Sequence, residues 1–235
     1  MARPGRPPQD PARHLERAHR ILDAAAELIL RWGYDKTTVE DVARAAGVAK
    51  GTIYLHWKTR DALFTALLRR DRVRLVEEVR AAEPATLPEL IGELTAALLR
   101  RPLTRAAVVG DSEVLGKLTR QKLERGTSEA DAAFGRYLDE LARLGAVRAD
   151  LTADERTALV TALVYGFLIP QSMLPQDRRL PDKRVAELVA DATARALGTG
   201  APPGQDVTRA TRAHLDEIEE TAAHRLARSL GQETR

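Results

Sequence analysis

The sequence predicts an all-α protein. Apolar residues recur three or four positions apart through most of the 235-residue chain, and no segment alternates apolar and polar residues as a half-buried strand does. Glycines and prolines divide the chain into segments of helical length. Apolar residues make up 44% of the chain, which is enough to bury a core.

Three helices are predicted near the N-terminus. Residues 12–32 carry one apolar stripe of an amphipathic helix, and Gly33 ends it. Residues 38–46 form the second helix, and Gly47 follows it where a left-handed residue is needed. The third helix begins at about residue 50 and is short.

Side chains that cap helices support two of these starting points. Thr38 and Asp41 have the spacing of a capping box at the start of the second helix. Thr59 is placed to cap a long fourth helix over 59–82, with Asp61 in its first turn. The same periodicity predicts further helices over 88–100, 103–109, 112–145 (kinked or split at its glycines), 153–173, 182–197 and 206–230.

The chain is expected to have three parts. Residues 1–58 form an N-terminal domain with a basic arm, and residues 59–198 form a larger helical domain. A linker and one additional helix occupy 199–235. The proline-containing segment after residue 82 is a soft boundary, because the 59–82 helix is expected to contribute to both domains.

Composition narrows the class of protein. The absence of cysteine excludes disulfides and thiolate metal sites, and the start of the chain lacks the apolar stretch of a signal peptide. The longest apolar stretch, 158–170, is too short to cross a membrane. We therefore expect a cytoplasmic protein with no cofactor and no bound metal, since the histidines lack metal-ligand spacing.

Positive charge is concentrated at the N-terminus. Residues 1–60 contain 11 Lys and Arg against 7 Asp and Glu, whereas residues 61–235 contain 26 against 27. A bias of four charges agrees with binding to nucleic acid but also with an ordinary solvated surface.

The segment GVAKGTIYLHW, residues 47–57, has the chemistry of a DNA-reading helix. Its glycine Gly51 allows close approach of the backbone to DNA, and Lys50 and Thr52 can contact phosphates or base edges. Ile53 and Trp57, four residues apart, are expected to face inward and hold the helix in place. A helix-turn-helix motif places such a helix in the major groove.

Residues 33–63, GYDKTTVEDVARAAGVAKGTIYLHWKTRDAL, closely resemble the DNA-binding signature of the TetR family of bacterial transcriptional regulators. The resemblance covers about 50 residues. It implies a homodimer that binds a DNA operator through its N-terminal domains and a small-molecule effector through its C-terminal domains. The positions that the resemblance assigns to DNA contact are Thr37, Thr38, Lys50, Gly51, Thr52, Tyr54, His56 and Lys58.

One position departs from the family pattern. Ala49 lies at the expected N-cap of the third helix, where the family usually has serine or threonine. Loss of such a cap costs on the order of 1 kcal/mol. We expect altered DNA affinity or sequence preference and not loss of function.

The remaining chain resembles the family only in the arrangement of its helices. This arrangement implies that 153–173 and 182–197 form a four-helix bundle with the same helices of a second subunit. The apolar residues assigned to that interface are Leu159, Leu163, Leu168, Val185, Leu188, Val189 and Ala192.

Aromatic residues of the larger domain are candidates for an effector pocket, because such pockets are mainly apolar with a few polar groups. Aromatic residues at helical spacing are, however, more often plain core. The four candidates are Phe134, Tyr137, Tyr165 and Phe167.

The function that the sequence favours is a ligand-responsive repressor without catalytic activity. Two alternatives are a helical enzyme or small-molecule carrier that retains a helix-turn-helix scaffold, and a protein that compacts DNA without sequence choice. Residues 110–116, GDSEVLG, look like a hydrolase nucleophile segment, but no strand precedes them, which argues against catalysis.

Overall fold

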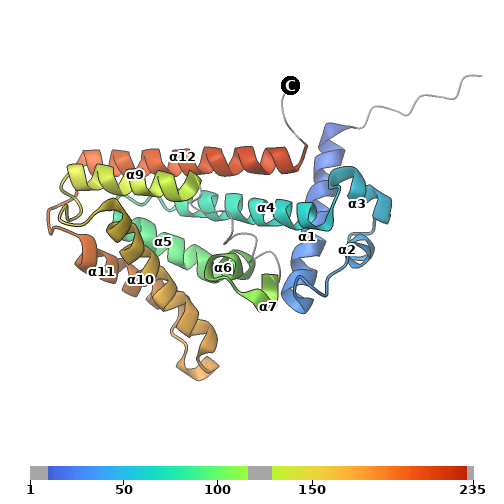
Figure 1. The fold of residues 1–235 in the computed structure, drawn as a ribbon, viewed down its shortest axis with the longest axis horizontal. Coiled ribbons are helices and arrows are strands. Elements are labelled where there is room, and N and C mark those ends of the chain that lie inside the picture. The colour runs from blue at the N-terminus through green and yellow to red at the C-terminus, as the bar shows by residue number, and fades with distance from the viewer. Residues whose placement is uncertain (1–9, 116–128, 232–235) are drawn as a thin grey trace, which may run out of the picture.

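Helices form where the spacing of apolar residues predicts them (Figure 1). The computed structural model describes residues 10–115 and 129–231. Within these residues the only extended pairing is an isolated antiparallel bridge between Val147 and Gly198. The all-α prediction is therefore confirmed.

Three helices form an N-terminal unit at one end of the molecule (Figure 1). They are α1 (Pro11–Trp32), α2 (Val39–Ala45) and α3 (Lys50–His56). The predicted basic arm before α1 lies outside the described residues, apart from its last arginines on α1 itself. We call α1 to α3 the N-terminal unit.

The predicted helix ends of this unit are confirmed. The Thr38 hydroxyl accepts a hydrogen bond from the Asp41 amide at 3.1 Å, and the Asp41 carboxylate accepts one from the Thr38 amide at 3.2 Å. Gly33 and Gly47 both have positive φ, 79° and 64°, so each ends its helix in a conformation that favours glycine. Thr59 caps the following helix by accepting from the Ala62 amide.

The remaining helices form an elongated body (Figure 1). The long helix α4 (Arg60–Ala81) leads from the N-terminal unit into it. The predicted 112–145 helix is present only as two described pieces, α7 and α9, and residues 116–128 between them lie outside the described part of the chain. The helices after α4 are α5 (Leu87–Arg100), α6 (Pro102–Val109), α7 (Ser112–Leu115), α9 (Glu129–Arg143), α10 (Ala153–Met173), α11 (Asp182–Leu197) and α12 (Gln205–Ser229), with a short 3₁₀ helix at Gln176–Arg178.

Two clusters of buried apolar side chains stabilise the molecule. One joins the N-terminal unit to the start of α4, to α6 and α7 and to the end of α12, and the other lies in the body between α4, α5, α9, α10, α11 and α12. Helix α4 contributes Leu63 and Phe64 to the first cluster and Leu75 and Val79 to the second. The expectation that this helix belongs to both parts of the chain is therefore correct.

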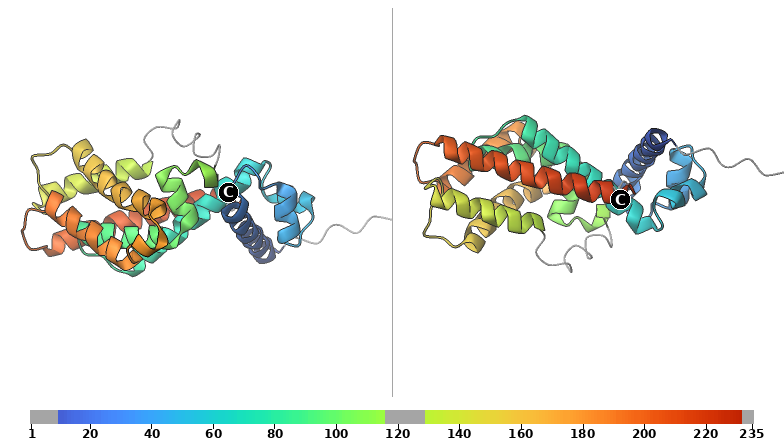
Figure 2. Two further views of the ribbon diagram at one scale, coloured as in Figure 1. Left: turned by 90° about the horizontal axis from the view of Figure 1, so that it is seen from below. Right: turned by 90° about the horizontal axis from the view of Figure 1, so that it is seen from above.

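Helix α12 runs the length of the body against α4 and α9 and ends beside the N-terminal unit (Figure 2). Near its start, Val207 and Leu215 are buried in the core of the body. At its end, Leu226 and Leu230 pack into the core of the N-terminal unit. The additional helix thus contacts both clusters, a role that the sequence did not indicate.

Three of the predicted interface residues are core residues of their own subunit. Leu168, Val185 and Val189 are almost fully buried within the single chain. They pack in the core of the body because α11 lies against both α5 and α10. Their assignment to a subunit interface is therefore corrected.

Candidate functional site: DNA-binding surface and ligand cavity

Helix α3 presents one face to solvent and buries the other. Ile53 and Trp57 are buried among the residues of α2 and α4, as predicted. Tyr54 is 38% exposed, and Leu55, which the sequence analysis did not single out, is 53% exposed. Leu55 does not pack in the core of the unit. Its side chain therefore adds an apolar group to the polar surface of α3, which could contact a thymine methyl group.

The basic group at the start of α3 is already engaged. Lys50 forms an ion pair with Glu40 of α2 and lies 5.9 Å from the centre of the Tyr54 ring. Lys58 lies in the turn after α3, and both lysine side chains are exposed. A pair between exposed groups contributes little to stability, about 0–1 kcal/mol, so a phosphate can compete for Lys50 at small cost.

Gly51 has no structural requirement for glycine. A Cβ added at this position would meet no atom within 4 Å, and the backbone there is an ordinary helix. Glycine inside a helix costs about 1 kcal/mol relative to alanine. Because Gly51 has no side chain, the backbone of α3 is accessible at this position and a second molecule could approach it closely.

The Thr37 side chain is not on the surface, contrary to the prediction. It is 0% exposed, and its hydroxyl donates a 2.8 Å hydrogen bond to the carbonyl of Gly33. Its own carbonyl accepts a 3.0 Å bond from Nε of Arg60. Thr37 therefore shapes the turn before α2, whereas its neighbour Thr38 is exposed and caps α2.

His56 also differs from the prediction. Its ring lies 4.0 Å from that of His14 on α1, and neither ring nitrogen has a hydrogen-bond partner among the described residues. Burial, with smaller contributions from the neighbouring His14 and Arg17, lowers the pKa of His56 to about 4. His56 is therefore neutral at pH 7 and packs α3 against α1 instead of extending towards phosphates.

Ala49 occupies the N-cap of α3, as predicted. No side chain accepts a hydrogen bond from the first amides of the helix. The Thr52 amide donates a 2.8 Å hydrogen bond to the Ala49 carbonyl, so the backbone alone closes this first turn. Thr52, the last predicted contact in this turn, is partly exposed.

The position of α3 is set by contacts at its C-terminal end. The indole Nε1 of Trp57 donates a 2.9 Å hydrogen bond to the carbonyl of Ser229 at the end of α12. Arg69 of α4 donates to the Ser229 hydroxyl at 2.6 Å and to the Arg225 carbonyl at 3.3 Å. Helix α12 is therefore attached both to α4 and to the residue that follows α3.

A mainly apolar cavity of about 210 Å³ lies in the body between α4, α5, α9, α10 and α12. Its walls include Val76 of α4, Ile91 of α5, Val160 of α10 and Ile218 of α12. A concave, mostly apolar site with a few polar groups is the usual form of a small-molecule site.

Two of the four predicted pocket aromatics line this cavity, Phe134 and Tyr165. The other two, Tyr137 and Phe167, do not line it. Tyr137 is buried, stacked 4.6 Å from His214, with its hydroxyl bonded to Thr211 at 2.9 Å. Phe167 packs partly buried against the core of the body.

The polar groups of the cavity come from helices that the sequence analysis did not connect with it. Arg72 of α4 and His214 of α12 both line it. His214 shares the apolar side of its helix with Leu215 and Ile218, and this unusual placement of a histidine is the signal that could have identified it. Arg72 carries no comparable signal, because arginines are frequent along α4.

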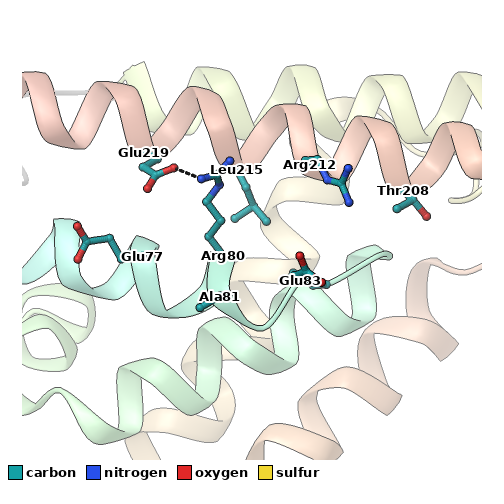
Figure 3. A pocket seen from close by; sticks show the side chains of 9 residues that line it. Glu77, Arg80, Ala81, Glu83, Thr208, Arg212, Leu215 and Glu219 are labelled. Carbon is teal, nitrogen blue, oxygen red and sulfur yellow. Dashed lines mark ion pairs between the residues drawn. The ribbon is translucent and has the colours of Figure 1, made fainter.

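A second hollow, the polar cleft of about 380 Å³, lies between α4 and α12 (Figure 3). Arg80 extends from α4 across it to Asp216 at 2.6 Å and Glu219 at 2.9 Å on α12. Its other charged residues, such as Glu77 and Arg212, are exposed. The ion pairs join the two helices, and the cleft offers no enclosed apolar wall for a ligand.

The described residues contain no group of three or more side chains placed to hold a metal ion. Nor does any helix in the described part of the chain have the length and apolar character needed to cross a membrane.

The exposed α3, held by α1, α2 and α4, defines a helix-turn-helix DNA-binding protein. Residues 21–67 match the family model for bacterial regulatory proteins of the tetR family. The chain is 30% identical over 139 residues to the helix-turn-helix-type transcriptional repressor KstR of Mycolicibacterium smegmatis, an alignment covering 52% of this chain and 68% of that protein. The chain therefore belongs to the TetR family.

Two further comparisons agree. The helix-turn-helix-type transcriptional repressor Rv1474c of Mycobacterium tuberculosis is 42% identical over 59 residues, but the alignment covers only 25% of this chain and 32% of that protein. The structure of SmeT of Stenotrophomonas maltophilia in complex with triclosan has a TM-score of 0.61 and 21% identity, and the match covers 80% of this chain and 96% of that one. The structural match supports the fold over 80% of the chain, and the match to Rv1474c spans only 59 residues.

Proposed function

We propose that this protein is a cytoplasmic, ligand-responsive transcriptional repressor that binds a pseudo-palindromic operator as a homodimer. The exposed face of α3 is the observation that supports it most strongly. Gly51 is required neither for packing nor for backbone conformation, and Lys50 and Tyr54 flank it on an exposed surface. A basic helix surface with an accessible backbone at Gly51 fits the major groove.

Contact with DNA would use a smaller set of side chains than the sequence suggested. Lys50, Thr52, Tyr54 and Lys58 extend from the exposed side of the unit, and Gly51 lets the α3 backbone approach. Thr38 would meet a phosphate at the start of α2, where the helix dipole favours an anion. Lys50 would exchange Glu40 for a phosphate.

Dimerisation is proposed to use the outer face of α10 and α11. Leu159 and Ile169 of α10 are exposed, and Leu163, Leu188 and Ala192 are only partly buried. The apolar side chains of Leu159, Leu163, Leu188 and Ala192 would be covered by a second copy of the chain. Two α3 helices would then meet half-sites about one helical turn apart.

The cavity is proposed as the effector site, since α4 and α12 each carry part of its wall and part of the core of the N-terminal unit. An effector with higher affinity for a state in which the two N-terminal units are differently separated would shift the population to that state. Operator affinity would then fall by the same factor by which DNA weakens effector binding.

Selection from a pool of random duplexes tests the proposal. The purified protein is expected to enrich a pseudo-palindromic site, and fluorescence anisotropy on that site is expected to show Lys50→Ala binding more weakly with the salt slope reduced by about 1. Lys183→Ala, which removes an exposed lysine from α11, is the matched control and should bind as the wild type does. Enrichment of no sequence, or equal behaviour of the two variants, would contradict the proposal.

A further inference from the structure

The wall of the cavity is apolar except at a few groups, and most of these are already engaged. The Tyr165 hydroxyl donates a 2.6 Å hydrogen bond to the carbonyl of Val108. Thr157 and Thr161 of α10 add uncharged hydroxyls to the wall. Arg72 and His214 add a guanidinium and an imidazole to the wall, and the carboxylate of Asp131 lines it as well.

Arg72 brings a half-buried positive charge to the cavity. Two charged groups act on it: Asp131 of α9 favours its charged form and Arg225 of α12 opposes it. Burial is the largest influence and lowers the pKa of Arg72 from its usual value, although a guanidinium stays protonated at neutral pH. Asp131 is exposed, so water screens its charge more than that of the half-buried Arg72.

His214 supplies a second, uncharged polar group. It is 7% exposed, its ring is stacked on Tyr137, and its Nδ1 is buried without a partner among the described residues. Burial is the main influence that lowers the pKa of His214 to about 4, so the ring is neutral at pH 7. A neutral imidazole has one N–H donor and one acceptor nitrogen.

We infer that the cavity binds a hydrophobic molecule with one anionic head group, a carboxylate or a comparable oxyanion, held by Arg72 and His214. This inference rests on the proposed assignment of the cavity as the effector site. The hydrocarbon body lies against the apolar side chains of α4, α5 and α10.

Charge selects this class over its alternatives. A carboxylate oxygen accepts from the guanidinium and can accept from the imidazole N–H, so both groups gain a partner. A neutral head adds no negative charge beside Arg72, whose partly buried charge is then offset by Asp131 but opposed by Arg225 and by burial. A cationic head is attracted by Asp131 but repelled by Arg72 and its neighbour Arg225, two positive charges against one negative charge.

Three probes of equal chain length test the inference: decanoate, decanol and decylamine, each below its aggregation concentration. Isothermal titration calorimetry at pH 7.4 is expected to show decanoate binding at least tenfold more tightly than the other two. Arg72→Gln should remove most of that preference, because a hydrogen-bonded charge interaction typically accounts for a tenfold or larger change. Decanol affinity should change little.

Arg80→Gln is the matched control, since Arg80 lies on the same helix but points into the polar cleft (Figure 3). It should keep the wild-type preference for decanoate. Arg72→Lys retains the charge without the guanidinium fork and should recover part of the preference. Thermal denaturation of each variant checks folding.

Equal affinity of the three probes, absence of binding by any of them, or a decanoate preference that persists in folded Arg72→Gln would overturn the inference. Failure of the proposed function has a different signature. A protein that prefers decanoate but selects no operator sequence retains the ligand class and loses the regulatory role. A protein that selects an operator but does not discriminate the probes retains the regulatory role and loses the ligand class.

Discussion

Removing the last turns of α12 is expected to destabilise the N-terminal unit. A chain that ends at His224 lacks Leu226 and Leu230, which pack into the core of that unit, and lacks Ser229, whose carbonyl accepts from the Trp57 indole. A chain that ends at Gly231 keeps all three residues and is the matched control.

The expected loss follows from the contacts removed. Full burial of a leucine side chain is worth about 1.5–3 kcal/mol, so Leu230 contributes about 2 kcal/mol and the partly buried Leu226 about 1 kcal/mol. The Trp57 hydrogen bond contributes about 1 kcal/mol. The total of about 4 kcal/mol is a large share of the 5–15 kcal/mol that typically stabilises a domain.

Tryptophan fluorescence makes the measurement specific to the N-terminal unit, because the two tryptophans of the chain are Trp32 in α1 and Trp57 after α3. In urea, the fluorescence midpoint of the shortened chain should fall well below that of the control. Leu230→Ala should lower the free energy of unfolding by about 2 kcal/mol, whereas Leu30→Ala, at a leucine of α1 that is 45% exposed, should change it by less than 0.5 kcal/mol. An unchanged fluorescence midpoint in the shortened chain would refute the argument.

Other perturbations of the N-terminal unit give distinct results. Gly51→Ala should stabilise α3 by about 0.5–1 kcal/mol yet weaken operator binding, and a variant that binds more tightly would contradict its role. Ala49→Ser should add a helix cap and raise stability by about 1 kcal/mol in urea unfolding. Glu40→Gln should raise operator affinity in anisotropy, because Lys50 loses its competing partner. The pKa of His56 is lowered to about 4 in the folded state, so protons bind the unfolded chain preferentially and stability should fall as the pH decreases from about 6.5 towards 4. His56→Gln should flatten that dependence, and an unchanged dependence would exclude His56 as its source.

The sequence was sufficient for the N-terminal unit because its determinants are local. Thr38 and Asp41 cap α2 three residues apart, and Gly47 ends it in a left-handed conformation. Ile53 and Trp57 are buried at helical spacing. Side-chain direction at single positions was less predictable. His56 is turned inward by its contact with His14, a residue 42 positions earlier, and no local rule contains that contact.

The cavity and the role of α12 depend on contacts between distant segments. Arg72 and His214 are 142 positions apart, and only the packing of α12 along α4 brings them to one wall. Apolar periodicity also could not separate core from interface in α10 and α11. Leu168 and Leu159 both follow the helical spacing, yet the first is buried within the chain and the second is exposed.

Helices α4 and α12 together limit how a ligand in the cavity can act on α3. Each has one end in the wall of the cavity and the other in the core of the N-terminal unit, with His214 and Leu230 about 24 Å apart along α12. Arg80 joins the two helices through Glu219, as Figure 3 shows, and through Asp216, and Arg69 joins them again beside Trp57. Because these contacts resist sliding of one helix along the other, we expect a ligand that separates the cavity walls to tilt the pair. The N-terminal unit, which packs on the ends of both, would then change its orientation relative to the body.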